Sequence, residues 1–442
     1  MTIDPSIRAT DLRQPLARLF ELARAKAVQL DRSWDPSRGS PVITVDGKYT
    51  TRGWTEWTQG FQYGCAVLAF DATDDRELLR IGRERTVAHM PAHVTHTGVH
   101  DHGFNNVSTY GNLRRLMREG RIPHDEWEVR YYELALRCSG AVQASRWSTT
   151  ADHLGYVYSF NGPHSLFVDT IRTLRVLGLA HQLGHVLMGE NDEKISLLER
   201  LLLHLKSTQK YLVIDGTSRH TYDVRGRTAH EAVFNRNDGR FRNRATQQGF
   251  SPFSTWTRGL AWAMLGFAEQ LEFLKAIGHT DALAGYEDTA RATCDHYIED
   301  CSAADGITYW DDGAPGLSQM GDWRARPAEP FNDHEPVDSS ASAIAAQGLL
   351  RLGRHLNDDR YAQAGLSIGR TLLDEPYLAT DVNHQGLLLH TVYHRPNNWD
   401  NIPAGRKVPC GESCMWGDYH LLELGVYLQR LIDGGPYPKF FD

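Results

Sequence analysis

Two aspartates have sequence contexts that could support proton transfer. Asp169 in HSLFVDTIRTL and Asp101 in GVHDHGFNN each stand at the expected start of a helix. A carboxylate there is most often a cap, worth about 1 kcal/mol, and that alternative stays open for Asp101. Asp169 has Phe167, Val168 and Ile171 around it, so we expect it to be buried. Burial raises a carboxyl pKa, and a second carboxylate nearby raises one of the two further, which would provide a proton donor at neutral pH.

A second group of residues could bind an anion. The stretch FSTWTRGLAWAMLGFAEQL predicts a buried helix, which Ser254 or Thr255 could cap by accepting a backbone N–H. Arg258 and Trp262 are four residues apart and therefore share one face of that helix. A guanidinium beside an indole suits a ligand with a flat, weakly polar face and an anionic group. A sugar acid is such a ligand.

Helical hairpins are the elements that would position these residues. Each pairs a helix rich in apolar and small residues with a more amphipathic helix across a short polar turn, as in residues 60–82, 167–205, 259–297 and 341–373. The first helix of each pair should be buried and the second outer. A closed ring of such hairpins, an α/α toroid, would use most of the 442 residues as one domain, 1–442. The main strand candidates are ITYWDD and GYVYSF.

The starts of the buried helices share an unusual composition. If alternate helices line the inside of the ring, these starts lie at one end of it. They read WTEWTQGF, HDHGFNN, HSLFVDT, FSTWTRG, VDSSASA and CMWGDY, a recurring mixture of aromatic residues, Asp and Arg. Capping alone would require only Ser, Thr or Asp. The mixture therefore favours a shared ligand pocket at that end.

The overall composition limits the partners and the location. A formal net charge of −8 without a basic stripe argues against a nucleic acid or an anionic membrane as partner. The N-terminus has no cationic segment followed by an apolar core, and no run of about 18 apolar residues occurs, so the expected location is the cytoplasm. The six scattered cysteines, including Cys410 and Cys414, fit structural free thiols better than a disulfide scaffold or a metal site.

The sequence offers little support for a metal or a cofactor. His100 and His102 flank Asp101, but a spacing of two residues on a loop is weak evidence, and no HExxH or CxxC pair occurs. His220 in DGTSRHTYD has the pattern of a solvated loop histidine when it is considered alone. Because GxSxG, Walker and dinucleotide motifs are lacking, we expect neither a serine nucleophile nor a nicotinamide cofactor.

Several segments together resemble a known family. STWTRGLAW, HDHGF, FVDTIRTLRVLGLAH, ATQQG, DSSASAIAAQGLL and CMWGDYHLLE are similar to the motifs of the unsaturated glucuronyl hydrolases, glycoside hydrolase family 88. The related unsaturated rhamnogalacturonyl hydrolases of family 105 share much of this pattern. The resemblance runs from about the WTQGF segment to WGDY, with the motifs in family order. It implies an all-α barrel of six hairpins, (α/α)6, and an enzyme that needs neither a metal nor an organic cofactor.

The resemblance also implies a substrate and a reaction. The family acts on oligosaccharides left by polysaccharide lyases, whose non-reducing sugar carries a C4=C5 double bond. The enzyme hydrates that bond, and the resulting hemiketal rearranges and expels the neighbouring sugar. By resemblance Asp169 is the general acid/base and Asp101 the second carboxylate, and a neutral Asp169 beside an ionised Asp101 would suit the chemistry. The implied substrate-binding residues are Trp57, His220, Gln247, Gln248, Arg258 and Trp262.

The chain departs from the family pattern at two positions. Gln247 stands where the family has the histidine of ATHQG, and Gln62 stands where a tryptophan commonly follows GF. We expect both changes to fall in or near the sugar pocket.

Two other functions remain open from the residues. A polysaccharide lyase on the same toroid could use Tyr110, Tyr156 or Tyr222 to abstract a C5 proton. A non-catalytic sugar-binding toroid would retain the aromatic residues but would need no carboxylate pair.

Overall fold

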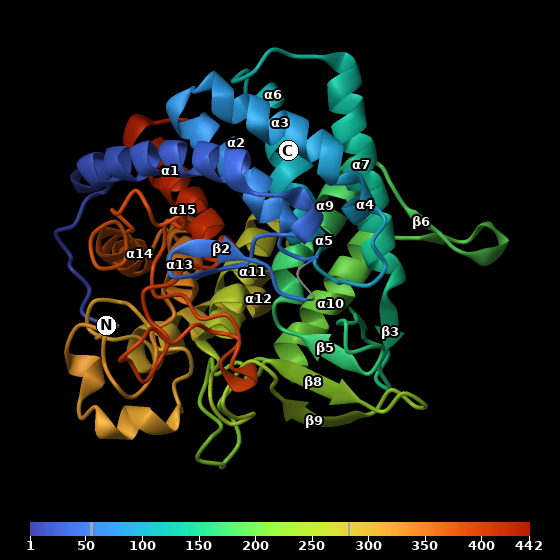
Figure 1. The fold of residues 1–442 in the computed structure, drawn as a ribbon. Helices are drawn as coiled ribbons and strands as arrows, with labels where there is room; N and C mark the ends of the chain where they lie inside the picture. Colours follow the sequence, from blue (N-terminus) through green and yellow to red (C-terminus); the bar gives the residue numbers. More distant parts are fainter. Residues whose placement is uncertain (54–55, 282) are drawn as a thin grey trace.

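The computed structural model describes residues 1–53, 56–281 and 283–442, and its main helices alternate between an inner and an outer ring (Figure 1). The inner helices are α2 (Gln59–Thr73), the run of α5 (His102–Asn106), η3 (Val107–Gly111) and α6 (Asn112–Arg118), α8 (Thr170–Thr173) with α9 (Arg175–Gln182), α11 (Thr257–Ala276), α13 (Ser339–Leu356) and α15 (Met415–Asp433). The outer helices are α1 (Arg13–Ser33), α3 (Arg76–His89), α7 (Glu126–Ser145), α10 (Leu197–Tyr211), α12 (Leu283–His296) and α14 (Asp359–Leu372). This alternation confirms the predicted (α/α)6 barrel.

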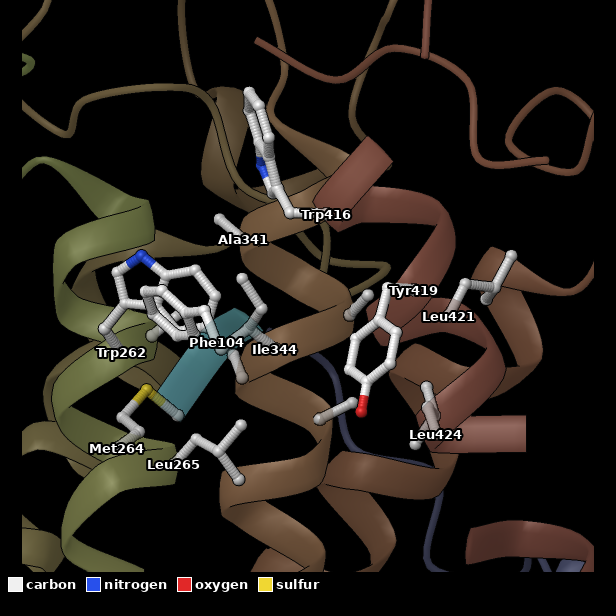
Figure 2. Packing of buried hydrophobic residues seen from close by; sticks show 14 of the residues in the cluster. Phe104, Trp262, Met264, Leu265, Ala341, Ile344, Trp416, Tyr419, Leu421 and Leu424 are labelled. Atoms are coloured by element: carbon white, nitrogen blue, oxygen red, sulfur yellow. The ribbon is translucent and has the colours of Figure 1, made fainter. Parts of the chain in front are cut away.

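The ring of inner helices closes on itself. α13 packs between α11 and α15, and α15 packs against α2, so the last helix of the chain meets the first inner helix. All side chains from Ser339 to Gly353 of α13 are buried, whereas outer helix α14 leaves one face exposed. Figure 2 shows this core where α11, α13 and α15 meet. Gly348 permits the close approach, because a Cβ there would lie 2.9 Å from the backbone nitrogen of Leu265.

Short strands connect the hairpins at the end of the barrel where the inner helices begin. β5 (Ser165–Phe167), β8 (Glu231–Phe234) and β9 (Phe241–Ala245) form an antiparallel sheet in the order β5-β8-β9. β5 ends two residues before Asp169, and β9 ends two residues before Gln247. The sheet therefore brings two predicted site residues, distant in sequence, to the same place.

Two-stranded antiparallel pairs account for the remaining strands of the described residues. They are β1 (Ile43–Val45) with β2 (Lys48–Thr50), β3 (Trp147–Thr149) with β4 (Gly155–Val157), and β6 (Leu187–Met188) with β7 (Lys194–Ile195). β4 confirms the strand predicted in GYVYSF. The prediction for ITYWDD was wrong, because residues 307–312 make only isolated bridges, such as Tyr309 with Val337.

The start of α11 also differs from expectation. Its N-cap residue is Trp256, and no side chain caps it, so the predicted Ser254 or Thr255 cap was wrong. Thr255 instead donates its backbone N–H to Asp312 at 2.6 Å and shares a hydrogen bond with His296. This part of the chain is held by tertiary contacts, which a local capping rule does not include. Trp54 and Thr55 of WTEWTQGF lie outside the described residues.

Crossing a membrane takes about 20 predominantly apolar residues. None of the helices within the described ranges combines that length with that apolarity.

Candidate active site

A cavity of about 590 Å³ lies at the barrel end where the inner helices begin. Residues at the starts of several inner helices line it, and the loops that precede α11 and α15 complete it. The predicted shared pocket is therefore present in the structure. Its lining residues are Trp57, His100, Asp101, Phe104, Phe160, Asn161, Asp169, Gln247, Gln248, Trp256, Arg258, Trp262, Tyr393, His394, Asn397 and Trp399.

Asp101, His100 and Asp169 form a buried cluster in this cavity. His100 Nε2 lies 3.1 Å from Asp169 Oδ1 and 3.7 Å from Asp101 Oδ1. The two aspartates occupy the N-cap positions of α5 and α8, but neither side chain makes a capping hydrogen bond. The cap interpretation that was open for Asp101 is therefore wrong, and both carboxyl groups are available to the cavity.

The pKa values of the cluster are perturbed in opposite directions. Burial raises the pKa of Asp101 to about 6, and the charge of Asp169 adds to this effect while His100 opposes it. Burial also acts to raise the pKa of Asp169, but the hydrogen bond and charge of His100, with the charges of His230 and Arg258, lower it overall. The expectation that Asp169 has the higher pKa of the two is thus reversed without substrate, because His100 bonds to Asp169.

Arg258 is almost completely engaged with the protein. Its Nη1 donates to Asp338 Oδ2 at 2.6 Å and to the carbonyl of Val392. Its Nη2 donates to Gln248 Oε1 at 2.9 Å and to the carbonyl of Tyr393 at 2.8 Å. Each Nη carries two N–H groups, so all four have partners. Arg258 is therefore paired with an acidic residue at the start of another helix, Asp338, and this pairing competes with a direct contact to a uronate. Its positive charge still lies in the lining of the cavity.

Gln247 and Gln248 are placed by a histidine that the sequence analysis missed. His230 Nδ1 accepts the backbone N–H of Gln247 at 2.9 Å and that of Gln248 at 3.4 Å. Its ring packs between Phe167 and Trp256, with centroid distances of 4.4 and 4.7 Å. Burial lowers the pKa of His230 to about 3, so the ring is neutral and Nε2 carries the proton. Within the described residues this buried Nε2 has no hydrogen-bond partner.

Aromatic side chains form one wall of the cavity. Trp57 packs against Trp416 at 4.9 Å and against Phe104 at 6.1 Å, and Phe104 packs against Trp262 at 4.8 Å. Trp256 and Trp416 lie 4.8 and 5.1 Å from the guanidinium carbon of Arg258. The two predicted tryptophans, Trp57 and Trp262, therefore belong to one continuous surface that a sugar ring could contact.

A loop before α15 supplies lining residues that the sequence did not indicate. His394, Asn397 and Trp399 lie on or beside the short helix η8 (Arg395–Asn397). Asp400 holds this loop by accepting the backbone N–H groups of Tyr393 and His394. The polar and aromatic composition of HRPNNWD could have indicated a ligand-binding loop. The local pattern, however, does not show that this loop lies beside helix starts that are distant in the chain.

Two predicted positions are not in the cavity. His220 is exposed in the loop after α10, stacks on Tyr222 and is not among the lining residues. Its assignment as a uronate contact was wrong in this respect; the buried histidine beside the carboxylates is His230. Gln62 accepts a hydrogen bond from Gln59 at 2.7 Å and lines a small crevice between α1 and α2. Only Gln247 of the two departures from the family pattern lies at the pocket.

The tyrosines that a lyase could have used do not line the cavity. Tyr110 is fully buried, Tyr156 donates to the carbonyl of Pro163 at 2.8 Å, and Tyr222 is exposed. Burial raises the pKa of both Tyr110 and Tyr156, which makes them weaker candidates for deprotonation at neutral pH. These positions do not support proton abstraction from a sugar in this cavity.

The groups with metal-ligand chemistry have other partners. His102 is bonded through Nδ1 to the hydroxyl of Ser139 at 2.8 Å and through Nε2 to the carbonyl of His96 at 2.8 Å. Among the described residues, one group of potential ligands lies close together, formed by His296, Cys301 and Asp312. Arg227 is paired with Asp312 at 3.3 Å, and its positive charge competes with a cation at that place. This group lies outside the cavity lining.

Known proteins are similar to this chain over nearly its whole length. No family model matches. An unsaturated glucuronyl hydrolase of Bacillus sp. strain GL1 is 26% identical over 412 residues, which cover 90% of this chain and 93% of that protein. An unsaturated chondroitin disaccharide hydrolase of Streptococcus pyogenes serotype M1 is 24% identical, covering 93% of this chain and 90% of that protein. These similarities confirm the resemblance found in the motifs.

Solved structures support the same fold. A crystal structure of an unsaturated glucuronyl hydrolase specific for heparin matches with a TM-score of 0.74 and 19% identity, covering 97% of this chain and 100% of the other. The structure of the Bacillus sp. GL1 unsaturated glucuronyl hydrolase matches with a TM-score of 0.71 and 23% identity, covering 96% and 97% of the two chains. At these identities the structural matches establish the α/α barrel.

Proposed function

We propose that this chain, a homologue of the unsaturated glucuronyl hydrolases, is a glycoside hydrolase that acts on unsaturated uronyl oligosaccharides produced by polysaccharide lyases. It hydrates the C4=C5 double bond of the non-reducing sugar, and the resulting hemiketal rearranges and expels the neighbouring sugar. The observation that carries this proposal is the buried cluster of Asp101, His100 and Asp169 in the lining of an aromatic-walled cavity. A binding protein would have no need for two carboxyl groups in a buried pocket, since their desolvation is costly.

Asp169 is the proposed general acid and base. Hydration of a vinyl ether requires a proton on carbon and a positioned water. One carboxyl group can donate the proton to carbon and then accept a proton from the attacking water. The Asp169 side chain is 12% exposed, twice the 6% of Asp101, and it faces the cavity that a substrate would occupy. His100 Nε2 holds one of its oxygens and leaves the other for the reaction.

The cluster also provides the proton that Asp169 needs. Burial raises the pKa of Asp101 to about 6, and the two carboxylates raise the pKa of His100 although burial acts to lower it, so both groups favour holding a proton beside Asp169. An incoming uronate adds a negative charge, which raises the pKa of every neighbouring carboxyl. Substrate binding thus favours protonation of Asp169 at the moment when the acid is required.

The uronate carboxylate is proposed to bind near Gln248 and Arg258. Arg258 Nη2 donates to Gln248 Oε1 and so fixes the orientation of this side-chain amide, whose nitrogen has donors suited to a ligand oxygen. Arg258 contributes its positive charge and holds Gln248 in place. Trp57 and Trp262 contact the faces of the sugar, and Gln247 takes the family's histidine position at the opening.

A panel of lyase-generated unsaturated disaccharides tests the function. Each is incubated with the protein while the ultraviolet absorbance of the C4=C5 bond is followed, and intact polymers serve as the matched comparison. Loss of absorbance from a disaccharide is the expected result. A rise in absorbance from an intact polymer would instead identify a lyase, and binding of a disaccharide without any change would identify a non-catalytic toroid.

The location and the organisation of the chain are part of the proposal. We infer a cytoplasmic enzyme, since all six cysteines are unpaired and most are buried. We also infer a single catalytic domain, 1–442, because one continuous core extends from Ile7 to Phe441. Its partner is the unsaturated oligosaccharide, and the proposed chemistry requires no cofactor, nucleic acid or membrane.

A further inference from the structure

Three aromatic side chains gather on the surface near the pocket. His220 stacks flat on Tyr222, with ring centroids 5.2 Å apart and an angle of 3° between the planes. Tyr222 contacts Phe253 at 4.7 Å. Tyr222 is 39% exposed and Phe253 is 55% exposed. We call His220, Tyr222 and Phe253 the rim platform. Aromatic surface left exposed in this way commonly marks a binding site.

The rim platform is held together from beneath by one arginine. Arg227 Nη1 donates to the backbone carbonyl of Tyr222 at 3.0 Å and to that of Phe253 at 2.9 Å. Its Nη2 is paired with Asp312, which also accepts the backbone N–H of Thr255. Two segments that are distant in sequence are thus fixed side by side before any ligand arrives, which lowers the entropy cost of binding to them.

A short segment of the chain, residues 248–256, links the cavity to the rim platform. Gln247 and Gln248 line the cavity at one end of this segment, and Trp256 lines it at the other. Phe253 lies in the turn between them, and its side chain is exposed. A saccharide that extends out of the cavity on the side of Gln248 and Trp256 would therefore pass over Phe253 and Tyr222.

We propose that the rim platform is a binding subsite for a sugar ring of the substrate that lies beyond the bond being cleaved. The C–H faces of a pyranose stack on aromatic rings, as they do on Trp262 inside the cavity. This inference rests on the proposed function, since it concerns the reducing-end part of the same saccharide. It gives the enzyme a preference for unsaturated oligosaccharides longer than a disaccharide.

The test compares an unsaturated disaccharide with an unsaturated tetrasaccharide made from the same polymer. For the wild-type protein the KM of the tetrasaccharide is expected to be lower. Tyr222→Ala and Phe253→Ala should each raise that KM roughly three- to tenfold and leave the KM of the disaccharide within about twofold. Both changes keep the backbone carbonyls that Arg227 binds. Trp127→Ala, which removes a 78% exposed tryptophan from outer helix α7, is the matched control and should change neither value.

Binding is measured separately from turnover so that the two proposals can fail independently. Calorimetric titration of Asp169→Asn with both saccharides gives affinities without cleavage. If the platform variants, made in this background, bind the tetrasaccharide as tightly as Asp169→Asn alone, the subsite is disproved even when the wild type is active. If the wild type cleaves neither saccharide, the proposed function fails, whereas selective loss of tetrasaccharide affinity in the platform variants still supports the subsite.

Discussion

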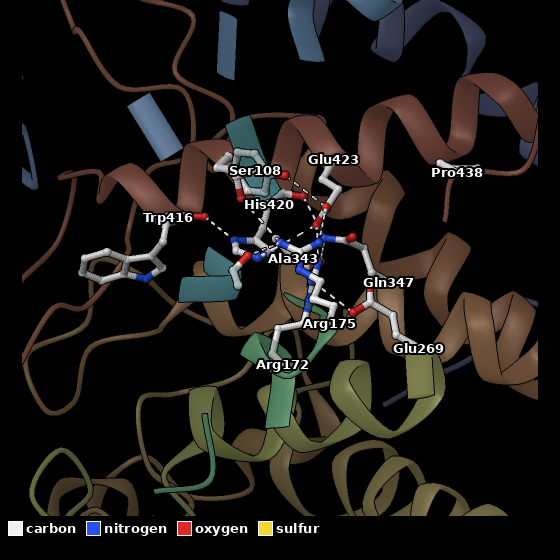
Figure 3. Close-up of polar contacts among 12 residues, drawn as sticks. Ser108, Arg172, Arg175, Glu269, Ala343, Gln347, Trp416, His420, Glu423 and Pro438 are labelled. Atoms are coloured by element: carbon white, nitrogen blue, oxygen red, sulfur yellow. Dashed lines mark hydrogen bonds and ion pairs between the residues drawn. The ribbon is translucent and has the colours of Figure 1, made fainter. Parts of the chain in front are cut away.

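Both ends of the barrel bury charged residues, but the way in which the charges are paired differs between the two ends. At the end opposite the cavity, Arg172 pairs with Glu269 at 3.0 Å and with Glu423 at 2.8 Å, and Arg175 lies 3.5 Å from Glu423 (Figure 3). At the cavity end, two carboxyl groups share the single histidine His100. The first arrangement neutralises its charges in pairs, whereas the second leaves a proton to be distributed among three groups.

The C-terminal tail packs across the end of the barrel opposite the cavity. Arg351 donates to the carbonyl of Pro438 at 2.9 Å, Phe440 packs against Phe273, and Asp442 pairs with Arg114 at 2.7 Å. The arginines lower the pKa of Glu423, although burial acts to raise it. Buried charge therefore supports the fold where it is compensated and supports chemistry where it is not.

Removal of the Asp169 carboxyl should have the largest effect. Asp169→Asn keeps the shape of the side chain but removes its proton, so we expect turnover of an unsaturated disaccharide to fall by roughly 100- to 10,000-fold. Circular dichroism should show an unchanged fold. Asp322→Asn, at an exposed position, is the control. A folded Asp169→Asn protein that kept more than about a tenth of wild-type turnover would remove Asp169 from the role of acid.

Breaking a pair at the end opposite the cavity should affect stability instead. Glu423→Gln leaves Arg172 and Arg175 without their shared carboxylate, and loss of one partner of a buried pair costs about 3–5 kcal/mol of unfolding free energy. Denaturant unfolding measures this, and kcat of the folded protein should remain close to wild type. Glu299→Gln, which breaks a surface pair with Arg360, should cost less than about 1 kcal/mol. Equal losses for the two variants would contradict the contrast between the two ends.

Asp101→Asn should lower activity and raise stability together. We expect about a 100-fold loss of kcat/KM and the disappearance of the pH-rate limb near pH 6, because the group with the raised pKa is gone. Since the folded pKa of Asp101 lies above its unfolded value, its contribution to stability is present at low pH and is lost as pH rises through about 6. The variant should therefore gain melting temperature relative to wild type at pH 8 but not at pH 4. An unchanged pH-rate profile would show that Asp101 does not titrate in the reaction.

Substitution of Arg258 should give the smallest of these effects, and it should lower both catalytic activity and thermal stability. Arg258→Lys cannot reproduce four donors in a planar fork, so it should be nearly as harmful as Arg258→Ala. We expect kcat/KM to fall roughly ten- to a hundredfold, with a lower melting temperature because Asp338 loses its partner. Asp338→Asn is the comparison: if it melts earlier but retains kcat/KM, the Arg258 charge serves the substrate. A variant of Arg258 that melts earlier yet turns over normally would make this residue purely structural.

The sequence alone determined the architecture and most of the pocket. Helical periodicity is a local property, and the apolar surface of α11 and α13 could be satisfied only inside a ring of other helices. Because the inner helices of a ring start at one end, the residues at those starts had to meet there. This is why Asp101, Asp169, Trp57, Trp262 and their neighbours were predicted together.

Which residue carries each property of the site depends on contacts that form only in the folded chain. The proton distribution depends on His100 lying 3.1 Å from Asp169, which is 69 residues away in the chain, and a local pattern does not specify that distance. The same holds for His230 in place of His220, and for Arg258, whose partners Val392 and Tyr393 are more than 130 residues distant. Periodicity fixes which face of a helix is buried, whereas pKa values and hydrogen-bond partners depend on atoms that the closure of the ring brings within a few ångströms.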